Sequence, residues 1–138
     1  MHSLKEDLLA LYRKTFFTIE TPHGVYEMCL DKVNSEFKKF LHRNRILKWG
    51  LITSDNPGAV RLSELQNQVN RRRLEETIKK YVSLRAVAMS RNNDIHEIGY
   101  FIAHITREEI TRLGKVFEQS AVFCGDQDGN VEVLWLRD

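Results

Sequence analysis

The residues of this chain whose types and spacing could do chemistry are uncharged amides that follow an apolar segment. The stretch from Trp49 to Leu74 starts with a run typical of a buried strand and continues through the turn sequence Asp-Asn-Pro-Gly. The helix expected after this turn carries Asn67 and Asn70 on nearly the same face, because a helix rotates by about 100° per residue. An amide offers donors and an acceptor without charge, which suits recognition of a base, an amide or a sugar edge. We therefore expect any site of this protein to lie beside this stretch.

Several familiar catalytic and metal-binding patterns are missing from the sequence. The five histidines lack metal-ligand spacing, and neither the HExxH motif nor the G-x-S-x-G nucleophile motif occurs. The segment 126–130 is similar to a calcium loop, but Val131 and Arg137 stand where an EF-hand needs Gly and Glu. A hairpin turn is predicted there instead. The sequence thus predicts neither a metal nor a cofactor.

The composition is that of an ordinary globular protein. Hydrophobic residues make up 42% of the chain and charged residues 29%, and no apolar run is long enough to cross a membrane. The two cysteines are far apart in apolar contexts, so we expect reduced thiols and a cytoplasmic location. A net charge of +2 is nearly balanced, which argues against nucleic-acid binding. The basic run Arg71–Arg73 is followed by acidic residues and predicts a solvated helix face.

Hydrophobic periodicity and capping signals predict helices and strands along the whole chain. Capping boxes are expected where Ser63 precedes Gln66 and where Thr106 precedes Glu109. The predicted helices cover 4–13, 33–43 and 63–82, with a fourth after Thr106, and the predicted strands cover 15–21, 25–30, 46–53, 85–90, 97–105, 120–124 and 131–135.

The resulting order, α-β-β-α-β-α-β-β-α-β-β, predicts an α+β fold within a single domain over residues 1–138. Short connections force antiparallel neighbours, whereas strand-helix-strand stretches allow parallel ones. We therefore expect one mixed, mostly antiparallel sheet with helices packed on it. The strand at 46–53 should be buried on both faces, because it is apolar throughout. Pro57 should end that strand and bias Asn56 towards extended geometry.

Three segments resemble an uncharacterised family of small bacterial proteins. They are ITSDNPG at 52–58, LSELQNQVN at 62–70 and FEQSAVF at 117–123, which follow the pattern ITxxNPG … LSxxxNxxN … FxQxAVF. The hairpin at 15–30 and the helix after it also fit, so the resemblance covers most of the chain. One departure is that His96 and Ile98 flank a glutamate which the family tends to place between an aromatic residue and a proline. The resemblance implies the fold and a shared polar cluster, and it brings no activity.

The polar positions that the resemblance implies are Asn56, Asn67, Asn70, Glu97 and Gln119. They could form a ligand pocket, or they could be a buried network that satisfies backbone groups between a strand end and a helix start.

Three functions follow from these possibilities. We expect a non-enzymatic module that binds a small molecule in a polar pocket. The first alternative is a regulator or inhibitor whose protein partner docks on the sheet edge or on the helix with Arg71–Arg73. The second is a small hydrolase or transferase in which Glu97 is the general base. The oligomeric state stays open.

Overall fold

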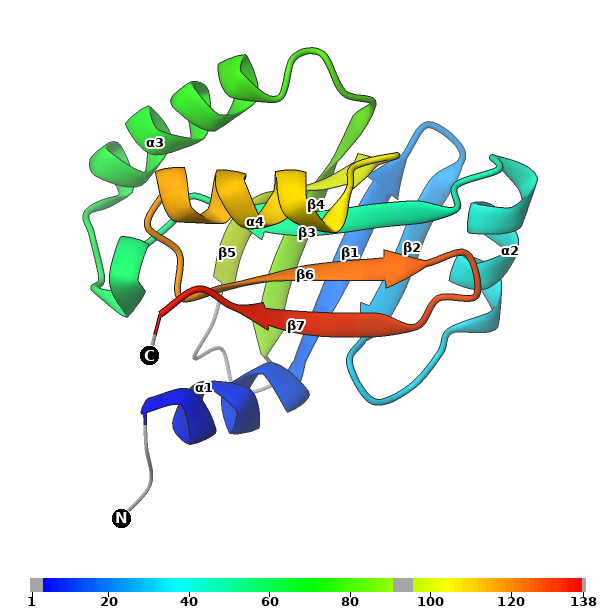
Figure 1. Cartoon of the computed structure of the whole chain (residues 1–138), viewed down its shortest axis with the longest axis horizontal. Coiled ribbons are helices and arrows are strands. Elements are labelled where there is room, and N and C mark those ends of the chain that lie inside the picture. The colour runs from blue at the N-terminus through cyan, green and yellow to red at the C-terminus, as the bar shows by residue number, and fades with distance from the viewer. Residues whose placement is uncertain (1–3, 91–95, 138) are drawn as a thin grey trace.

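The computed structural model describes residues 4–90 and 96–137, and its helices and strands follow the predicted order (Figure 1). Both predicted capping boxes, at Ser63 and Thr106, are present. The helices are α1 (Leu4–Arg13), α2 (Ser35–Arg43), α3 (Glu64–Thr77) and α4 (Arg107–Val116), and the strands are β1 (Thr15–Thr21), β2 (Gly24–Cys29), β3 (Lys48–Thr53), β4 (Ser83–Ser90), β5 (His96–Ala103), β6 (Ala121–Asp126) and β7 (Val131–Trp135). The predicted α+β class is confirmed.

The strands of the described ranges form one seven-stranded sheet in the order β2-β1-β4-β5-β3-β6-β7. All of their pairings are antiparallel, so the expected antiparallel character is confirmed, and the parallel pairs that we allowed do not occur among these strands. The reason lies in the connections that contain helices. Each of them joins strands that are not neighbours: β5 lies between β3 and β4, and β3 lies between β5 and β6.

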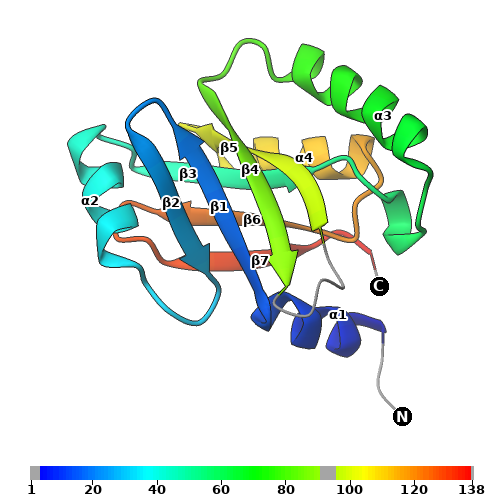
Figure 2. The same ribbon diagram turned by 180° about the vertical axis from the view of Figure 1, so that it is seen from behind.

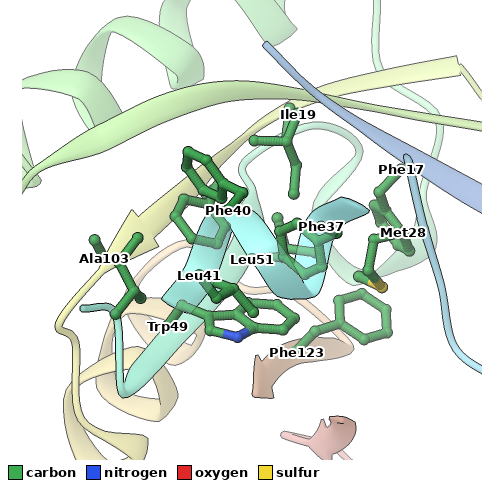
Figure 3. Close-up of a cluster of buried hydrophobic side chains, with 13 residues drawn as sticks. Phe17, Ile19, Met28, Phe37, Phe40, Leu41, Trp49, Leu51, Ala103 and Phe123 are labelled. Carbon is green, nitrogen blue, oxygen red and sulfur yellow. The ribbon is translucent and has the colours of Figure 1, made fainter. Parts of the chain in front are cut away.

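The sheet is strongly curled, so that β1, β2 and β4 cross over β3, β6 and β7 (Figures 1 and 2). Phe17 of β1 and Phe123 of β6 are not on adjacent strands, yet their ring centroids lie 5.1 Å apart inside the curl. Helix α2 inserts Phe37 and Phe40 into this interior (Figure 3). Helix α1 lies away from α2, and its Tyr12 ring meets Phe123 edge-on at 5.3 Å. The curl therefore encloses an aromatic core and has α1 beside it.

Strand β3 separates two hydrophobic cores. Trp49 and Leu51 belong to the core inside the curl, whereas Ile52 belongs to a second core that includes residues of α3 and α4. Gly50 lets α4 approach closely, because a Cβ atom there would lie 2.9 Å from the side chain of Ile110. The prediction that this strand is buried on both faces is confirmed, with four consecutive buried residues.

Helix α3 ends earlier than its apolar pattern predicts. The backbone N–H of Ile78 caps the helix by donating to the carbonyls of Leu74 and Glu76, and the chain then turns through a bond from Tyr81 N–H to the Ile78 carbonyl. The Tyr81 hydroxyl donates to Glu109 of α4. Tyr81 thus contributes to the second core from a turn and not from the helix. The predicted helix over 63–82 was therefore too long at its C-terminal end.

Candidate functional site

A buried ion pair anchors the loop that follows β3. The Asp55 side chain is 2% exposed and that of Arg71 is 12% exposed. The guanidinium donates from Nε to Oδ1 at 2.8 Å and from Nη2 to Oδ2 at 2.7 Å, and its Nη1 donates to Glu64. Asp55 Oδ2 also accepts from the backbone N–H of Ile98 at 3.2 Å. One carboxylate therefore ties this loop to α3 and to β5.

Asn56, the next residue, has left-handed backbone geometry with φ 49° and ψ 59°. The prediction of an extended conformation before Pro57 was therefore wrong. Asparagine tolerates the left-handed region better than most residues, and here its side chain and backbone make long-range hydrogen bonds that outweigh the local preference. Gly58 follows with φ 65° and donates its N–H to the Glu118 carbonyl at 2.7 Å. The chain thus reverses its direction within three residues, and hydrogen bonds from Asn56 and from Gly58 hold the turn in place.

Asn56 and Asn67 form a reciprocal pair. The Asn56 backbone N–H donates to Asn67 Oδ1 at 3.0 Å, and Asn67 Nδ2 donates to Asn56 Oδ1 at 3.1 Å. The same Asn56 oxygen accepts from the backbone N–H of Leu62 at 2.9 Å. Asn67 is 5% exposed. Its amide is therefore used to fix the loop against the first turns of α3.

Glu97 on β5 accepts a hydrogen bond from the side-chain amide of Asn56. Asn56 Nδ2 donates to Glu97 Oε2 at 2.8 Å. Burial raises the pKa of the Glu97 carboxyl above its ordinary value; the hydrogen bond from Asn56 opposes this rise, the charge of Asp55 adds to it, and the charge of Arg71 opposes it. The loop thus holds one oxygen of a partly buried carboxyl group that keeps its proton more readily than a free glutamate.

Gln119 approaches the same loop from the segment between α4 and β6. Its side chain is buried, and its Nε2 donates to the carbonyls of Asp55 and Phe117, each at 3.3 Å. Two carbonyl acceptors fix the orientation of the amide, because only the nitrogen can donate to them. Both hydrogen bonds donated by the Gln119 side-chain amide therefore go to backbone carbonyls.

The fifth expected residue, Asn70, is not part of this cluster. It lies three residues after Asn67, which rotates it by about 60° around the helix. Its amide oxygen accepts only a long bond from Arg73, at 3.5 Å, among the described residues. The structure thus brings Asn56, Asn67, Glu97 and Gln119 together and leaves Asn70 outside.

Replacing Asn67 with alanine should lower the free energy of unfolding by about 1–3 kcal/mol, because it leaves the Asn56 backbone N–H without its acceptor and removes one of the two donors to Asn56 Oδ1. Urea denaturation of the variant and the wild type measures this cost. Asn70→Ala is the matched control and should change stability by less than about 0.5 kcal/mol. Equal effects of the two substitutions would contradict a structural role of the amide pair.

A cavity lies beside this cluster, between α1 and the curled sheet. Its outer hollow has a volume of about 310 Å³, and a smaller inner hollow has a volume of about 60 Å³. Tyr12, Glu97 and Gln119 line both hollows. The outer hollow is also lined by Leu8, Leu11, Asp55, Asn56, Ala59, Arg61, His96 and Ser120. Three polar side chains therefore stand where a polar hollow meets a more apolar one.

The inner hollow exists because small residues face it. Ala86 and Ala88 of β4, Gly99 of β5 and Ala121 of β6 all line it, together with larger core residues such as Phe123. Ala88 is paired directly with Glu97 across the two strands. Side chains this small leave space that a typical close-packed core would fill.

Sequence reasoning missed three residues of this region. Tyr12 lies within the predicted helix at 4–13 and has no sequence signal of its own, whereas in the structure burial and the charge of Glu97 raise its pKa to about 12. Asp55 belongs to the predicted turn, and Arg71 belongs to the basic run for which a solvated face is predicted. Their spacing of 16 residues gives no periodic signal, and only the return of α3 past the loop brings them together.

The pH dependence of stability should reveal the environment of Glu97. Its pKa is higher in the folded state, so its contribution is complete below the unfolded-state pKa and is lost as the pH rises through the folded-state pKa. Glu97→Gln keeps an acceptor for Asn56 and never ionises, so the variant should become more stable relative to the wild type as the pH rises. The difference can grow by at most about 1.4 kcal/mol per pH unit.

Urea denaturation of both proteins from about pH 4 to about pH 8 gives this difference, because groups common to both cancel. Glu27→Gln, on the exposed edge strand β2, is the control and should differ from wild type by a constant amount. A flat difference for Glu97→Gln would show that its carboxyl is as well solvated in the folded protein as in the unfolded chain.

Within ranges 4–90 and 96–137, His, Cys, Asp and Glu side chains do not gather into a group of three or more that could hold a metal ion. No helix in these ranges has the length and apolar character needed to span a membrane.

Comparison with known proteins identifies the family of this chain. The family model DUF3293, described as a protein of unknown function, matches residues 52–122, which is just over half of the sequence. The match covers the loop after β3, α3, β4, β5, α4 and the first residues of β6. No match was found among curated proteins or among solved structures. The chain therefore belongs to DUF3293, a family of proteins of unknown function.

Proposed function

We propose that this protein binds a small molecule in the cavity between α1 and the curled sheet, with a polar end of the ligand at Glu97 and Gln119. The observation that carries the proposal is the pair of hollows that meet at Tyr12, Glu97 and Gln119. Binding cavities are typically concave and mostly apolar, with a few polar groups that orient the ligand. The loop held by the Asp55–Arg71 ion pair would then be a rigid support for one wall.

The cellular location, the source and the domain organisation of the protein are also part of the proposal. Cys29 and Cys124 are partly buried and form no disulfide in the structure. This agrees with a reducing cytoplasm, and the resemblance of the motifs suggests a bacterial source. We also infer that residues 1–138 act as one domain, because strands from both ends of the chain share the sheet.

A second candidate function is protein binding through the outer face of α3. Leu65 and Val69 are 71% and 50% exposed there, one helical turn apart. Arg71 does not belong to this face, because it forms the buried ion pair with Asp55. The exposed basic residues of the face are therefore Arg72 and Arg73. An enzyme that uses Glu97 as a general base is a third candidate, favoured by the raised pKa of that carboxyl.

Filling the inner hollow tests the leading proposal. Ala88→Leu places a larger side chain beside Glu97, whereas Ala10→Leu makes the same change on the exposed face of α1. A library of small alcohols, amines, acids and amides should contain ligands that stabilise the wild type, by about 2.7 kcal/mol at a concentration 100 times Kd. Those ligands should fail to stabilise Ala88→Leu and should still stabilise Ala10→Leu.

The result separates the candidate functions. Ligands that stabilise wild type and Ala88→Leu equally would bind elsewhere and would overturn the cavity as the binding site. Chemical conversion of a ligand that stops in Glu97→Gln would favour the enzyme. A stoichiometric protein partner that is lost in Leu65→Asp and kept in Ala88→Leu would favour the α3 face.

A further inference from the structure

We propose that the cavity selects a primary ammonium group carried on a short apolar chain, with the ammonium between Glu97 and Gln119 and the chain in the inner hollow. This inference rests on the proposed function and names the class of its ligand.

The side-chain amides beside the junction of the two hollows donate hydrogen bonds inside the protein. Asn56 Nδ2 is bonded to Glu97, and Asn67 Nδ2 is bonded to Asn56. Gln119 Nε2 is bonded to two backbone carbonyls. Within the described residues, two acceptor oxygens of these side chains, Glu97 Oε1 and Gln119 Oε1, have no hydrogen bond, and the Tyr12 hydroxyl can act as donor or acceptor. A ligand group rich in donors complements such a site, and an ammonium offers three.

The charges around Glu97 favour a cation rather than an anion. Asp55 lies near it from the loop, and Arg71 lies near it from α3, but these two groups are paired with each other. No cation among the described residues is within ion-pair distance of Glu97. Tyr12, on α1, contributes a neutral hydroxyl, because its pKa is raised to about 12. A carboxyl group that is partly buried and has no ion-pair partner among the described residues gains most from a ligand that supplies one.

The shape of the cavity sets the rest of the ligand. The inner hollow of about 60 Å³ is lined by Phe17, Leu51, Ala88 and Phe123 among others, so it suits a chain of a few carbon atoms. Arg61 and His96 line only the outer hollow and are exposed at its rim. The ammonium could therefore belong to a simple alkylamine, or to an amino acid whose carboxylate lies near Arg61. Both sources share the same chemistry at Glu97.

The test compares ligands that differ only in their polar group. Binding of n-butylamine, n-butanol and butyrate to the full chain is measured by titration calorimetry, and L-norvaline is added as the amino-acid arm. We expect n-butylamine to bind at least tenfold more tightly than the alcohol or the acid. L-Norvaline should bind more tightly than n-butylamine, with the gain lost in Arg61→Ala, if the source is an amino acid.

Three further measurements bear on the role of Glu97. Glu97→Gln should weaken n-butylamine binding at least tenfold and leave n-butanol binding within twofold. Glu108→Gln, on the exposed start of α4, is the matched control and should change neither. Binding of the amine should strengthen as the pH rises through the raised pKa of Glu97, because Glu97 must release its proton to pair with the ammonium. Asp55, Arg71 and Tyr12 near Glu97, and Arg61 and His96 of the outer hollow, are unchanged in Glu97→Gln, so the comparison of this variant with wild type isolates Glu97.

The possible failures are distinct. Equal binding of the amine and the alcohol, preference for butyrate, or amine binding unchanged in Glu97→Gln would overturn the ammonium class and leave the cavity as a binding site. Binding of none of the four ligands, together with no cavity-dependent ligand in the library described above, would overturn the proposed function as well.

Discussion

Replacing Arg71 with alanine is expected to lower the free energy of unfolding by about 3–5 kcal/mol, the typical cost of removing one partner of a buried ion pair. The substitution leaves the Asp55 carboxylate, 2% exposed, with the Ile98 backbone N–H as the remaining hydrogen-bond donor to it among the described residues. It also removes one of the links between the loop and α3, the other being the Asn56–Asn67 pair. Urea denaturation followed by far-ultraviolet circular dichroism measures the loss.

The next residue of the helix supplies the control. Arg72 is exposed and carries the same charge, so Arg72→Ala should change stability by less than about 0.5 kcal/mol. Arg71→Lys should fall between the two, because an ammonium cannot reproduce the two parallel bonds of a guanidinium. In a double-mutant cycle, Asp55→Ala and Arg71→Ala should together cost less than the sum of the two single changes. Arg71→Ala and Arg72→Ala variants of equal stability would rule out a supporting role for this ion pair.

Trp49→Ala is the second large prediction, with an expected loss of about 3–5 kcal/mol. Trp49 is 0% exposed, and its ring stacks on Phe101 at 5.6 Å and meets Phe37 edge-on at 5.4 Å. Its Nε1 donates to the Asp126 carbonyl at 2.8 Å. The ring also occupies the space beside Gly125, where a Cβ atom would lie 2.1 Å from it. Truncation therefore creates a cavity and leaves a carbonyl without its donor.

The other tryptophan of the chain is a natural comparison. Trp135 lies on the edge strand β7, is only partly buried, and stacks on Tyr12 at 6.0 Å. Trp135→Ala should therefore cost less than half as much as Trp49→Ala in the same denaturation experiment. Trp49→Phe should recover most of the loss, because it refills the space without restoring the hydrogen bond. Similar losses for the two alanine variants would mean that the interior of the curl is not the main core.

The order of the elements and the ends of most of them could be predicted from the sequence, because these features depend on residues close together in the chain. The capping boxes at Ser63 and Thr106 act over three residues, and alternating apolar residues mark a strand wherever it lies. Two local predictions were wrong where distant partners intervened. Asn56 became left-handed through its bonds to Asn67 and Glu97, and Tyr81 left the helix pattern to meet Glu109.

The residues of the candidate site also divide into those that the sequence indicates and those that only the structure shows. Resemblance to a family implied four of the residues that the structure brings together, but their contacts join positions far apart in the chain: Asn56 and Glu97 are 41 residues apart, and Gln119 and the Asp55 carbonyl are 64 apart. The pairing of Asp55 with Arg71, the place of Tyr12 in the cavity wall and the hollow left by small residues carry no local signal.

The sequence by itself therefore determined which segments are helices and strands, since periodicity and capping are short-range properties. The tertiary structure alone decided the strand order, the curl of the sheet and the donors and acceptors that remain for a ligand. These depend on which distant side chains meet, and such meetings are set by packing of the whole chain rather than by any one of its segments.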